Sequence, residues 1–204
     1  MYFEVSFDKK ITYKKVLEGY SKGIFPMGDV FDNSLSWYFT DPRGIIKLEP
    51  DFKGINIPRS LKQVLKKNLF EVKVDTKFKE VIENCSYRFD TWITPKIKKL
   101  YITLHNKGYA HSVETYQGNK LVGGLYGVAY KGAFFGESMF YIEPNASKVA
   151  FIKLYEILIK NNYLLFDIQM ITPVFKILGA INIPIKVYHQ LLSKAMSVER
   201  EFLY

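Results

Sequence analysis

Residues 110–141, AHSVETYQGNKLVGGLYGVAYKGAFFGESMFY, decide the fold. Three runs rich in β-branched and aromatic residues, 110–116, 121–130 and 133–141, are separated by Gln117-Gly118-Asn119 and by Lys131-Gly132. Short connections that contain Gly are typical of β-hairpins. This stretch therefore predicts an antiparallel meander of three strands.

Helices and further strands flank the meander on both sides. Apolar side chains recur at helical spacing in four stretches, 13–20, 78–85, 97–104 and 145–160. Strands are predicted at 37–39, 70–74 and 163–170, and a turn at Asp41-Pro42-Arg43-Gly44. Because helix, meander, helix and strand follow one another, we expect an α+β fold.

The composition is that of a globular chain. The 204 residues are 48% hydrophobic and 24% charged, which excludes a mainly disordered protein. The longest uncharged stretch, 121–130, has ten residues, about half of the ~20 that a membrane span needs. Cys85 is the single cysteine, which excludes an internal disulfide. One Cys and three His that are not closely paired in the sequence argue against a structural zinc site. We expect a cytoplasmic protein without secretory signal, metal or cofactor.

Positive charge is concentrated in the first half of a chain whose net charge is +9. Residues 52–79 hold eight Lys or Arg and two acidic residues, a net charge of +6. Such a segment can attract a polyanion such as a nucleic acid, or it can be an ordinary solvated helix face. The sheet-centred part follows a change of character at 85–90, which predicts two units, 1–88 and 89–204.

Two carboxylates stand in apolar strands. Asp167 lies in LLFDIQM, where alternation puts it on the same face as Leu165 and Gln169. Either it is buried with a partner and serves a reaction centre, or the strand ends there in water. Glu137 follows Gly136 in the third meander strand, where alternation puts Phe134, Gly136 and Phe140 opposite Glu137 and Met139. Whether the strands of Glu137 and Asp167 are neighbours does not follow from their spacing.

Other reactive residue types admit an ordinary structural explanation. His105 and His111 can act as bases or support the fold, and Cys85 continues an apolar helical stripe that favours a place in the core. The cluster Gly123-Gly124-x-x-Gly127 lacks the features of a phosphate loop. It marks either a bulge or a wall against which a ligand or backbone packs closely.

Nine short blocks, in order along the chain, are similar to the leucyl/phenylalanyl-tRNA–protein transferase family. They are GYSKGIFP (19–26), WYFTDPR (37–43), TWIT (91–94), GYAHSVE (108–114), LVGGLYGV (121–128), GESMF (136–140), NASK (145–148), DIQ (167–169) and LGA (178–180). Each block alone is weak, whereas their succession is specific.

The resemblance implies a small N-terminal α/β domain, 1–88, and a C-terminal acetyltransferase-like (GNAT-like) domain, 89–204, with a mostly antiparallel central sheet. It implies an aminoacyltransferase that moves Leu or Phe, sometimes Met, from aminoacyl-tRNA to the N-terminal Arg or Lys of a protein. The product enters the N-degron pathway of protein degradation. Partners are the charged tRNA and acceptor N-termini, without a membrane, and the protein is expected to be monomeric.

The same resemblance implies the site. Asp167, Gln169 and Glu137 form the catalytic group, in which Asp167 polarises the attacking amine directly or through Gln169 while Glu137 orients the pair. Tyr20 and Tyr101 lie near the tRNA 3′ end and the acceptor. The substrate-binding set further contains Leu125, Phe134, Gly136, Ser138, Met139, Leu154 and Phe166. Lys62, Lys66 and Lys67 are expected to bind tRNA.

The chain departs from the family pattern at three places. Met27 replaces a Trp after Ile-Phe-Pro, the segment before Thr12 lacks a Gly-Gly-x-Leu stretch, and 171–173 lack a His. Two other functions stay open on the residues alone. One is a CoA-dependent N-acyltransferase, which the absence of an Arg/Gln-x-x-Gly-x-Gly/Ala loop opposes; the other is a noncatalytic RNA-binding module. The same chemistry with another donor or acceptor, such as acidic N-termini, is a further alternative.

Overall fold

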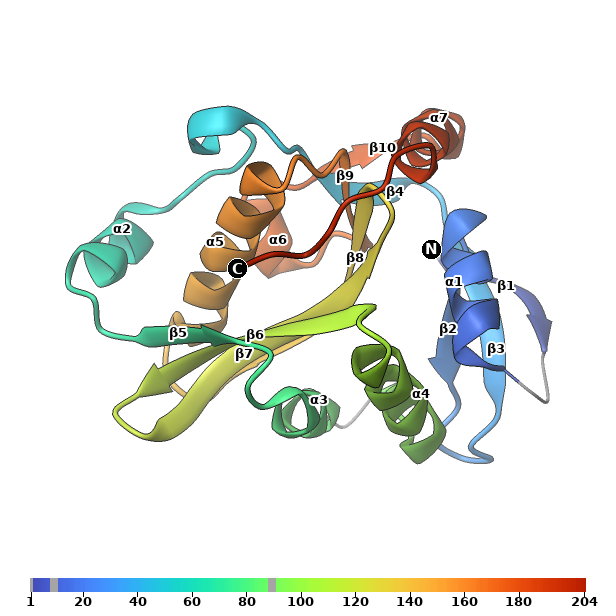
Figure 1. The fold of residues 1–204 in the computed structure, drawn as a ribbon, viewed down its shortest axis with the longest axis horizontal. Coiled ribbons are helices and arrows are strands. Elements are labelled where there is room, and N and C mark those ends of the chain that lie inside the picture. Colours follow the sequence, from blue (N-terminus) through green and yellow to red (C-terminus); the bar gives the residue numbers. More distant parts are fainter. Residues whose placement is uncertain (1, 8–10, 88–90) are drawn as a thin grey trace.

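The computed structural model describes residues 2–7, 11–87 and 91–204, which form a mixed α/β structure around a mostly antiparallel sheet (Figure 1). The large sheet has the strand order β10-β4-β9-β8-β7-β6-β5, and a small sheet has the order β1-β3-β2. The strands are β1 Tyr2–Phe7, β2 Phe25–Gly28, β3 Leu35–Thr40, β4 Arg43–Ile46, β5 Glu71–Val74, β6 Ala110–Gln117, β7 Lys120–Tyr130, β8 Ala133–Tyr141, β9 Leu165–Gln169 and β10 Ile181–Ile183.

Seven α-helices occur in the described residues, together with one short 3-10 helix, η1 Pro50–Phe52. The α-helices are α1 Tyr13–Ser21, α2 Arg59–Lys66, α3 Phe78–Ser86, α4 Pro95–Asn106, α5 Ala146–Lys160, α6 Pro173–Ile177 and α7 Ile185–Met196. In the described part of the chain, no helix has both the length and the apolar character needed to cross a membrane.

Two hydrophobic cores lie on opposite faces of the large sheet. One core combines buried side chains of α1, α3, α4 and α7 with those of the small sheet. The other is dominated by α5 and includes residues of α2 and α6. Figure 1 shows the same division, with α5 on one side of the strands and α1 with the small sheet on the other.

The predicted meander is confirmed. Strands β6, β7 and β8 pair antiparallel in sequence order, and the helices predicted around 13–20, 78–85, 97–104 and 145–160 are present. Both explanations of the Gly cluster apply. Gly123 and Gly127 each adjoin a register shift, and a side chain would collide with Ala146 of α5 at Gly123 and with the Phe135 carbonyl oxygen at Gly127.

Strand β4 was not predicted. Arg43 and Gly44, expected in a turn, instead begin a short strand that lies between β9 and β10. Its partner residues lie at least 120 positions later in the chain, and a pattern of four residues is too short to predict such a pairing. The structure also adds β1, β2 and β10 to the predicted elements.

The predicted division at residue 88 falls at 88–90, outside the described residues, and stays a prediction. Strands β4 and β5, which precede that position, both pair within the large sheet.

Candidate active site

A cavity of about 890 Å³ opens where β8 and β9 separate. These two strands pair in parallel from Ala133 with Leu165 to Phe135 with Asp167, and no further pairing is present beyond that point among the described residues. The continuing segments Gly136–Tyr141 and Ile168–Met170 both line the cavity, which extends along α5. A gap between the carboxyl ends of parallel strands is a frequent place for a ligand site.

The cavity gathers eight of the predicted site residues on its wall. They are Leu125, Gly136, Glu137, Ser138, Met139, Leu154, Phe166 and Gln169. Of the others, Tyr20, Tyr101 and Asp167 bind cavity residues from behind, and fully buried Phe134 packs edge-on against Phe166. The wall is therefore apolar along α5 and polar where β8 and β9 diverge.

Glu137 enters the site through a β-bulge. Gly136 pairs with Gly127 and Ser138 with Tyr126, so Glu137 is the extra residue on its strand. The bulge overturns the alternation expected from the sequence, because Met139 packs in the same core as Phe134 while Phe140 packs in the opposite one. Bulges commonly redirect a side chain beside an active site.

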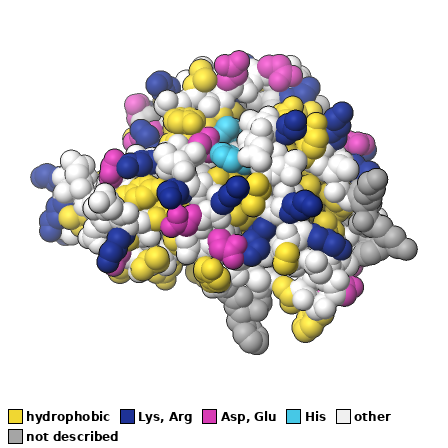
Figure 2. Space-filling view, turned by 60° about the horizontal axis from the view of Figure 1, so that its bottom comes forward, with side chains coloured by type: hydrophobic (Ala, Val, Ile, Leu, Met, Phe, Trp, Pro, Cys, Tyr) yellow, Lys and Arg dark blue, Asp and Glu magenta, His cyan; other side chains and the backbone are white. Residues whose placement is uncertain are grey.

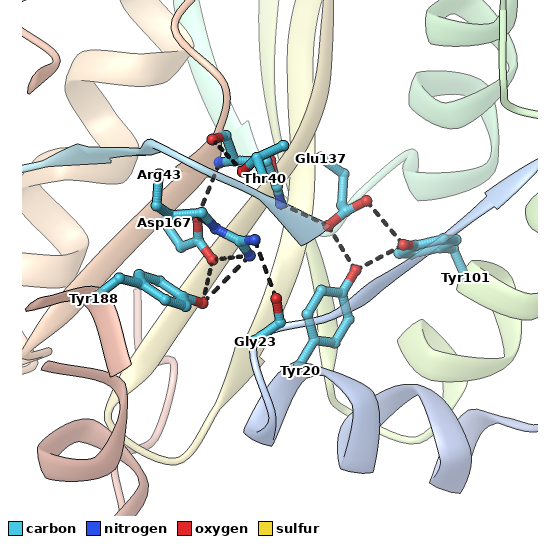
Figure 3. Close-up of polar contacts among 9 residues, drawn as sticks. Tyr20, Gly23, Thr40, Arg43, Tyr101, Glu137, Asp167 and Tyr188 are labelled. Atoms are coloured by element: carbon cyan, nitrogen blue, oxygen red, sulfur yellow. Dashed lines mark hydrogen bonds and ion pairs between the residues drawn. The ribbon is translucent and has the colours of Figure 1, made fainter. Parts of the chain in front are cut away.

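Three donors surround the Glu137 carboxylate (Figure 3). The Tyr20 hydroxyl donates to Oε1 at 2.5 Å, and the Tyr101 hydroxyl donates to Oε2 at 2.8 Å. The Gln169 side-chain amide donates to Oε1 at 3.3 Å, and the two tyrosine oxygens lie 2.7 Å apart. Tyr20 reaches this position from α1, where its ring stacks on Phe135, and Tyr101 reaches it from α4.

The three oxygen contacts among Glu137, Tyr20 and Tyr101 favour uptake of a proton. When Glu137 is ionised, the two phenol hydrogens can form only two of the three hydrogen bonds among these oxygens. When Glu137 carries a proton, three hydrogens are available and all three contacts can be hydrogen bonds. Burial raises the pKa of Glu137 to about 7, although the two tyrosine hydrogen bonds oppose the rise. Burial, followed by the charge of Glu137, raises the pKa of Tyr20 and Tyr101 well above 10, so both phenols stay protonated.

Asp167 is fully buried, so the possibility that its strand ends in solvent is wrong. Arg43 holds both of its oxygens, with Nε donating to Oδ1 at 2.9 Å and Nη2 donating to Oδ2 at 2.7 Å. The Tyr188 hydroxyl donates to Oδ2 at 2.7 Å, and the Gln169 backbone N–H donates to Oδ1 at 2.9 Å. Each oxygen of the Asp167 carboxylate thus accepts two hydrogen bonds. These bonds and the Arg43 charge stabilise a negative charge that would otherwise be costly to bury.

Arg43, like Tyr188, is a site residue that sequence reasoning missed. Its side chain is fully buried, its guanidinium lies 4.5 Å from the ring centre of Tyr188 and 5.0 Å from that of Phe25, and Nη1 donates to the Gly23 carbonyl. The available signal was an Arg separated only by Gly44 from the apolar pair Ile45-Ile46, in a chain whose buried Asp167 required a cationic partner.

Gln169 connects the two carboxylates. Its side chain donates to Glu137 and its backbone N–H donates to Asp167, while its carbonyl accepts from Thr40 at 3.0 Å. Its backbone is left-handed, with φ of 56°, a conformation that costs on the order of 1–3 kcal/mol for a residue other than Gly. The Asp167 and Thr40 contacts hold this conformation, which brings the amide to the cavity.

The apolar part of the cavity comes from four elements. Leu125 of β7, Met139 of β8, Leu154 of α5 and Phe166 of β9 all belong to the core on the α5 side. Such a wall accepts an unbranched or γ-branched apolar side chain and leaves a charged one unpaired.

The remaining candidates lie away from this wall. Cys85 is fully buried in α3, as the core explanation predicted. His111 Nδ1 lies 2.7 Å from Asp75 Oδ2 and His105 Nδ1 lies 2.8 Å from the Ala110 carbonyl; neither histidine lines the cavity, which favours a structural role. Met27 packs partly buried in the core on the α1 side.

Lys62, Lys66 and Lys67 are exposed on and just after α2. Basic side chains are spread over much of the face in Figure 2, with apolar and acidic side chains between them. Charge alone therefore does not single out one path for a polyanion, and the tRNA role of the three lysines stays a prediction.

Comparisons with known proteins show similarity over most of the chain. A family model described as leucyl/phenylalanyl-tRNA protein transferase matches residues 48–193. A protein named leucyl/phenylalanyl-tRNA--protein transferase from Synechococcus sp. is 41% identical over 92% of this chain and 96% of its own length. One of the same name from Rubrobacter xylanophilus is 40% identical over 95% of this chain and 99% of its own length.

A solved structure of a functionally unknown conserved protein from Staphylococcus epidermidis covers 90% of this chain and 68% of its own, at 10% identity and a TM-score of 0.44. That likeness is too weak to assign the fold, so the GNAT-like description stays a prediction. The sequence relationships are decisive for the family. The chain belongs to the leucyl/phenylalanyl-tRNA protein transferase family.

Proposed function

We propose that this protein transfers Leu or Phe, and sometimes Met, from aminoacyl-tRNA to the N-terminal Arg or Lys of an acceptor protein, which then carries an N-degron. Family membership supports the reaction class. The observation that carries the proposal is one cavity whose apolar wall, with Leu154 and Phe166, adjoins the polar pair Glu137 and Gln169.

The chemistry requires positioning more than a strong base. The donor is an activated ester, and an α-amine with a pKa of about 7.7–8.0 is partly neutral at pH 7. Holding ester and amine together can contribute up to about 7–11 kcal/mol to lowering the barrier. A buried site with fixed donors and acceptors supplies that restraint.

Gln169 orients the attacking amine, and Glu137 accepts its proton. Gln169 donates its amide hydrogen to Glu137, which leaves its side-chain oxygen to accept a hydrogen bond from the attacking amine. The amine nitrogen bonds to the ester carbon, and Glu137 takes the proton that the nitrogen loses. The bond from the ester carbon to the ribose oxygen then breaks, and Glu137 returns its proton to that oxygen, which leaves as a hydroxyl group.

Asp167 acts through Gln169 in this scheme. Its oxygens are occupied by Arg43, Tyr188 and the Gln169 backbone, so a direct contact with the amine would require one of these bonds to break. It fixes the left-handed backbone from which the Gln169 amide reaches the cavity.

The surroundings of the reaction follow from the same proposal. The donor tRNA body lies along Lys62, Lys66 and Lys67 in an N-terminal domain of residues 1–88, and a GNAT-like domain of residues 89–204 supplies the cavity. The protein works as a monomer in the cytoplasm, where charged tRNA is available.

A transfer assay tests the function. Radiolabelled Leu-tRNA and Phe-tRNA are offered with peptides that begin with Arg, Lys, Asp or Glu and are otherwise identical. We expect label on the Arg and Lys peptides alone. Transfer to the acidic peptides would replace the proposed acceptor, and absence of transfer to any peptide would refute the function.

A further inference from the structure

The N-terminal end of α5 forms a polar end of the cavity. Asn145, Ser147 and Lys148 line the cavity, and so do Phe151 and Leu154 further along the helix. Positions three, four and seven residues apart share a helix face, so one stripe of α5 changes from polar to apolar. Ser147 and Leu154 are separated by roughly 10 Å of helix, at about 1.5 Å per residue.

Ser147 has a hydroxyl without a partner. The residue is 4% exposed and lines the cavity, and its side chain has no hydrogen bond to any residue that the structure describes. Its donor and acceptor capacity is therefore open on the cavity side. A ligand atom that reaches this end of the cavity can satisfy it.

Lys148 places a positive charge beside that hydroxyl. Its ammonium donates to the Asn145 side-chain oxygen at 3.1 Å, and within the described ranges no carboxylate lies within 4 Å of it to form an ion pair. The first turn of α5 holds no acidic residue, and Asn145 makes no side-chain cap. The first backbone N–H groups of a helix lack intrahelical acceptors and carry a partial positive charge, which favours an anion.

We propose that Ser147, Lys148 and the first turn of α5 bind the phosphate on the 5′ side of the donor's terminal adenosine. The inference rests on the proposed function, because it takes an aminoacyl-tRNA as the ligand. Such a donor carries an apolar side chain, an ester, a sugar and a phosphate in that order. The cavity offers a region for each of these parts: an apolar wall, the polar pair Glu137 and Gln169, and this cationic end.

Exposed aromatic side chains also line the cavity. Tyr141 is 64% exposed and Tyr87 is 73% exposed, and both line the same cavity. Aromatic faces stack on nucleobases with little preference for sequence. Their exposed rings are available to stack on the nucleotides that precede the phosphate.

Binding of two stable donor analogues tests the phosphate site. Both link phenylalanine through an amide to the 3′ position of adenosine, and only one carries a 5′-phosphate. Their Kd values are measured by calorimetry for the wild type, Ser147→Ala and Lys148→Met. Lys153→Met is the matched control, because Lys153 is exposed on the same helix and does not line the cavity.

We expect the wild type and Lys153→Met to bind the phosphorylated analogue roughly tenfold more tightly. Lys148→Met should abolish most of this preference, and Ser147→Ala should reduce it. The ratio of the two Kd values within one protein cancels any general loss of affinity. Equal affinity of the wild type for both analogues, or a preference kept in Lys148→Met, overturns the proposal. Loss of transfer from Phe-tRNA to every peptide would instead refute the proposed function.

Discussion

Arg43 and Asp167 form a two-point ion pair, at 2.9 and 2.7 Å, in which neither side chain is exposed to solvent. The pair joins β4 to β9, two neighbouring strands whose sequences lie more than 120 residues apart. It therefore fixes a long-range strand pairing and, through the Gln169 backbone, one end of the reaction centre.

The first prediction concerns stability. Arg43→Met leaves a buried carboxylate without its cation, and we expect it to lower the free energy of unfolding by about 3–5 kcal/mol in a urea titration. The double variant Arg43→Met/Asp167→Leu removes both charges and should regain most of the lost free energy of unfolding. We expect it to lack transfer activity. A double variant no more stable than Arg43→Met would show that the pair does not account for the loss.

A second prediction separates positioning from tRNA binding. Asp167→Ala frees the Gln169 backbone, and we expect transfer to fall by about 100-fold or more, because small misplacements in a reaction centre have effects of this size. The Kd for Phe-tRNA should change little. Asp32→Ala serves as the control, since Asp32 is an exposed carboxylate outside the cavity lining. Wild-type activity in Asp167→Ala would reject the assignment.

The pH dependence of transfer tests Glu137. Burial raises its pKa to about 7, and the ionised form is the one that accepts a proton. The kcat/KM should therefore rise with pH through about 7, in addition to the rise caused by the acceptor amine. Glu137→Gln should lower kcat by roughly 100-fold, and the pH dependence that remains should be that of the acceptor amine. An unchanged inflection near 7 in this variant would assign it to another group.

Charge reversal tests the proposed tRNA path. Changing Lys62, Lys66 and Lys67 to Glu should weaken tRNA binding and reduce the slope of log Kd against log salt, by roughly one for each phosphate that the variant no longer neutralises. The matched control reverses Lys160, Lys186 and Lys194, three exposed lysines on α5 and α7, with the same change in net charge. Equal effects of the two sets would show that net charge, and not this path, governs binding.

Donor choice should respond to the volume of the apolar wall. Leu154→Phe narrows the cavity, and we expect kcat/KM for Phe-tRNA to fall roughly tenfold relative to that for Leu-tRNA. Leu192→Phe, a comparable enlargement in the opposite core, controls for general overpacking. A ratio of Phe to Leu transfer that is the same in both variants would remove Leu154 from the specificity wall.

Local patterns in the sequence predicted much of the fold. The hairpin residues around Gly118 and Gly132 and the apolar stripes of α1, α3, α4 and α5 depend on neighbours within a few residues. The strand β4 depends instead on β9, far away in the chain, and a four-residue pattern does not specify such a partner. The face expected for Met139 was wrong because a bulge at Glu137 shifts the alternation by one.

The site was predictable to a different extent. The cost of burying a carboxylate pointed to Asp167 and to the need for a partner, and the structure identifies that partner as Arg43. Its identity depended on the unpredicted strand. The left-handed backbone of Gln169 had no signal in the sequence, because it is imposed by contacts from Asp167 and Thr40.

Where β8 separates from β9, the facing main-chain groups of the two strands do not form the hydrogen bonds that a continuous sheet would provide. An opening made by diverging backbones persists when side chains around it are exchanged. Natural variation can thus retune which amino acid is accepted by replacing one or two wall residues, while the scaffold that holds the reacting groups is inherited intact.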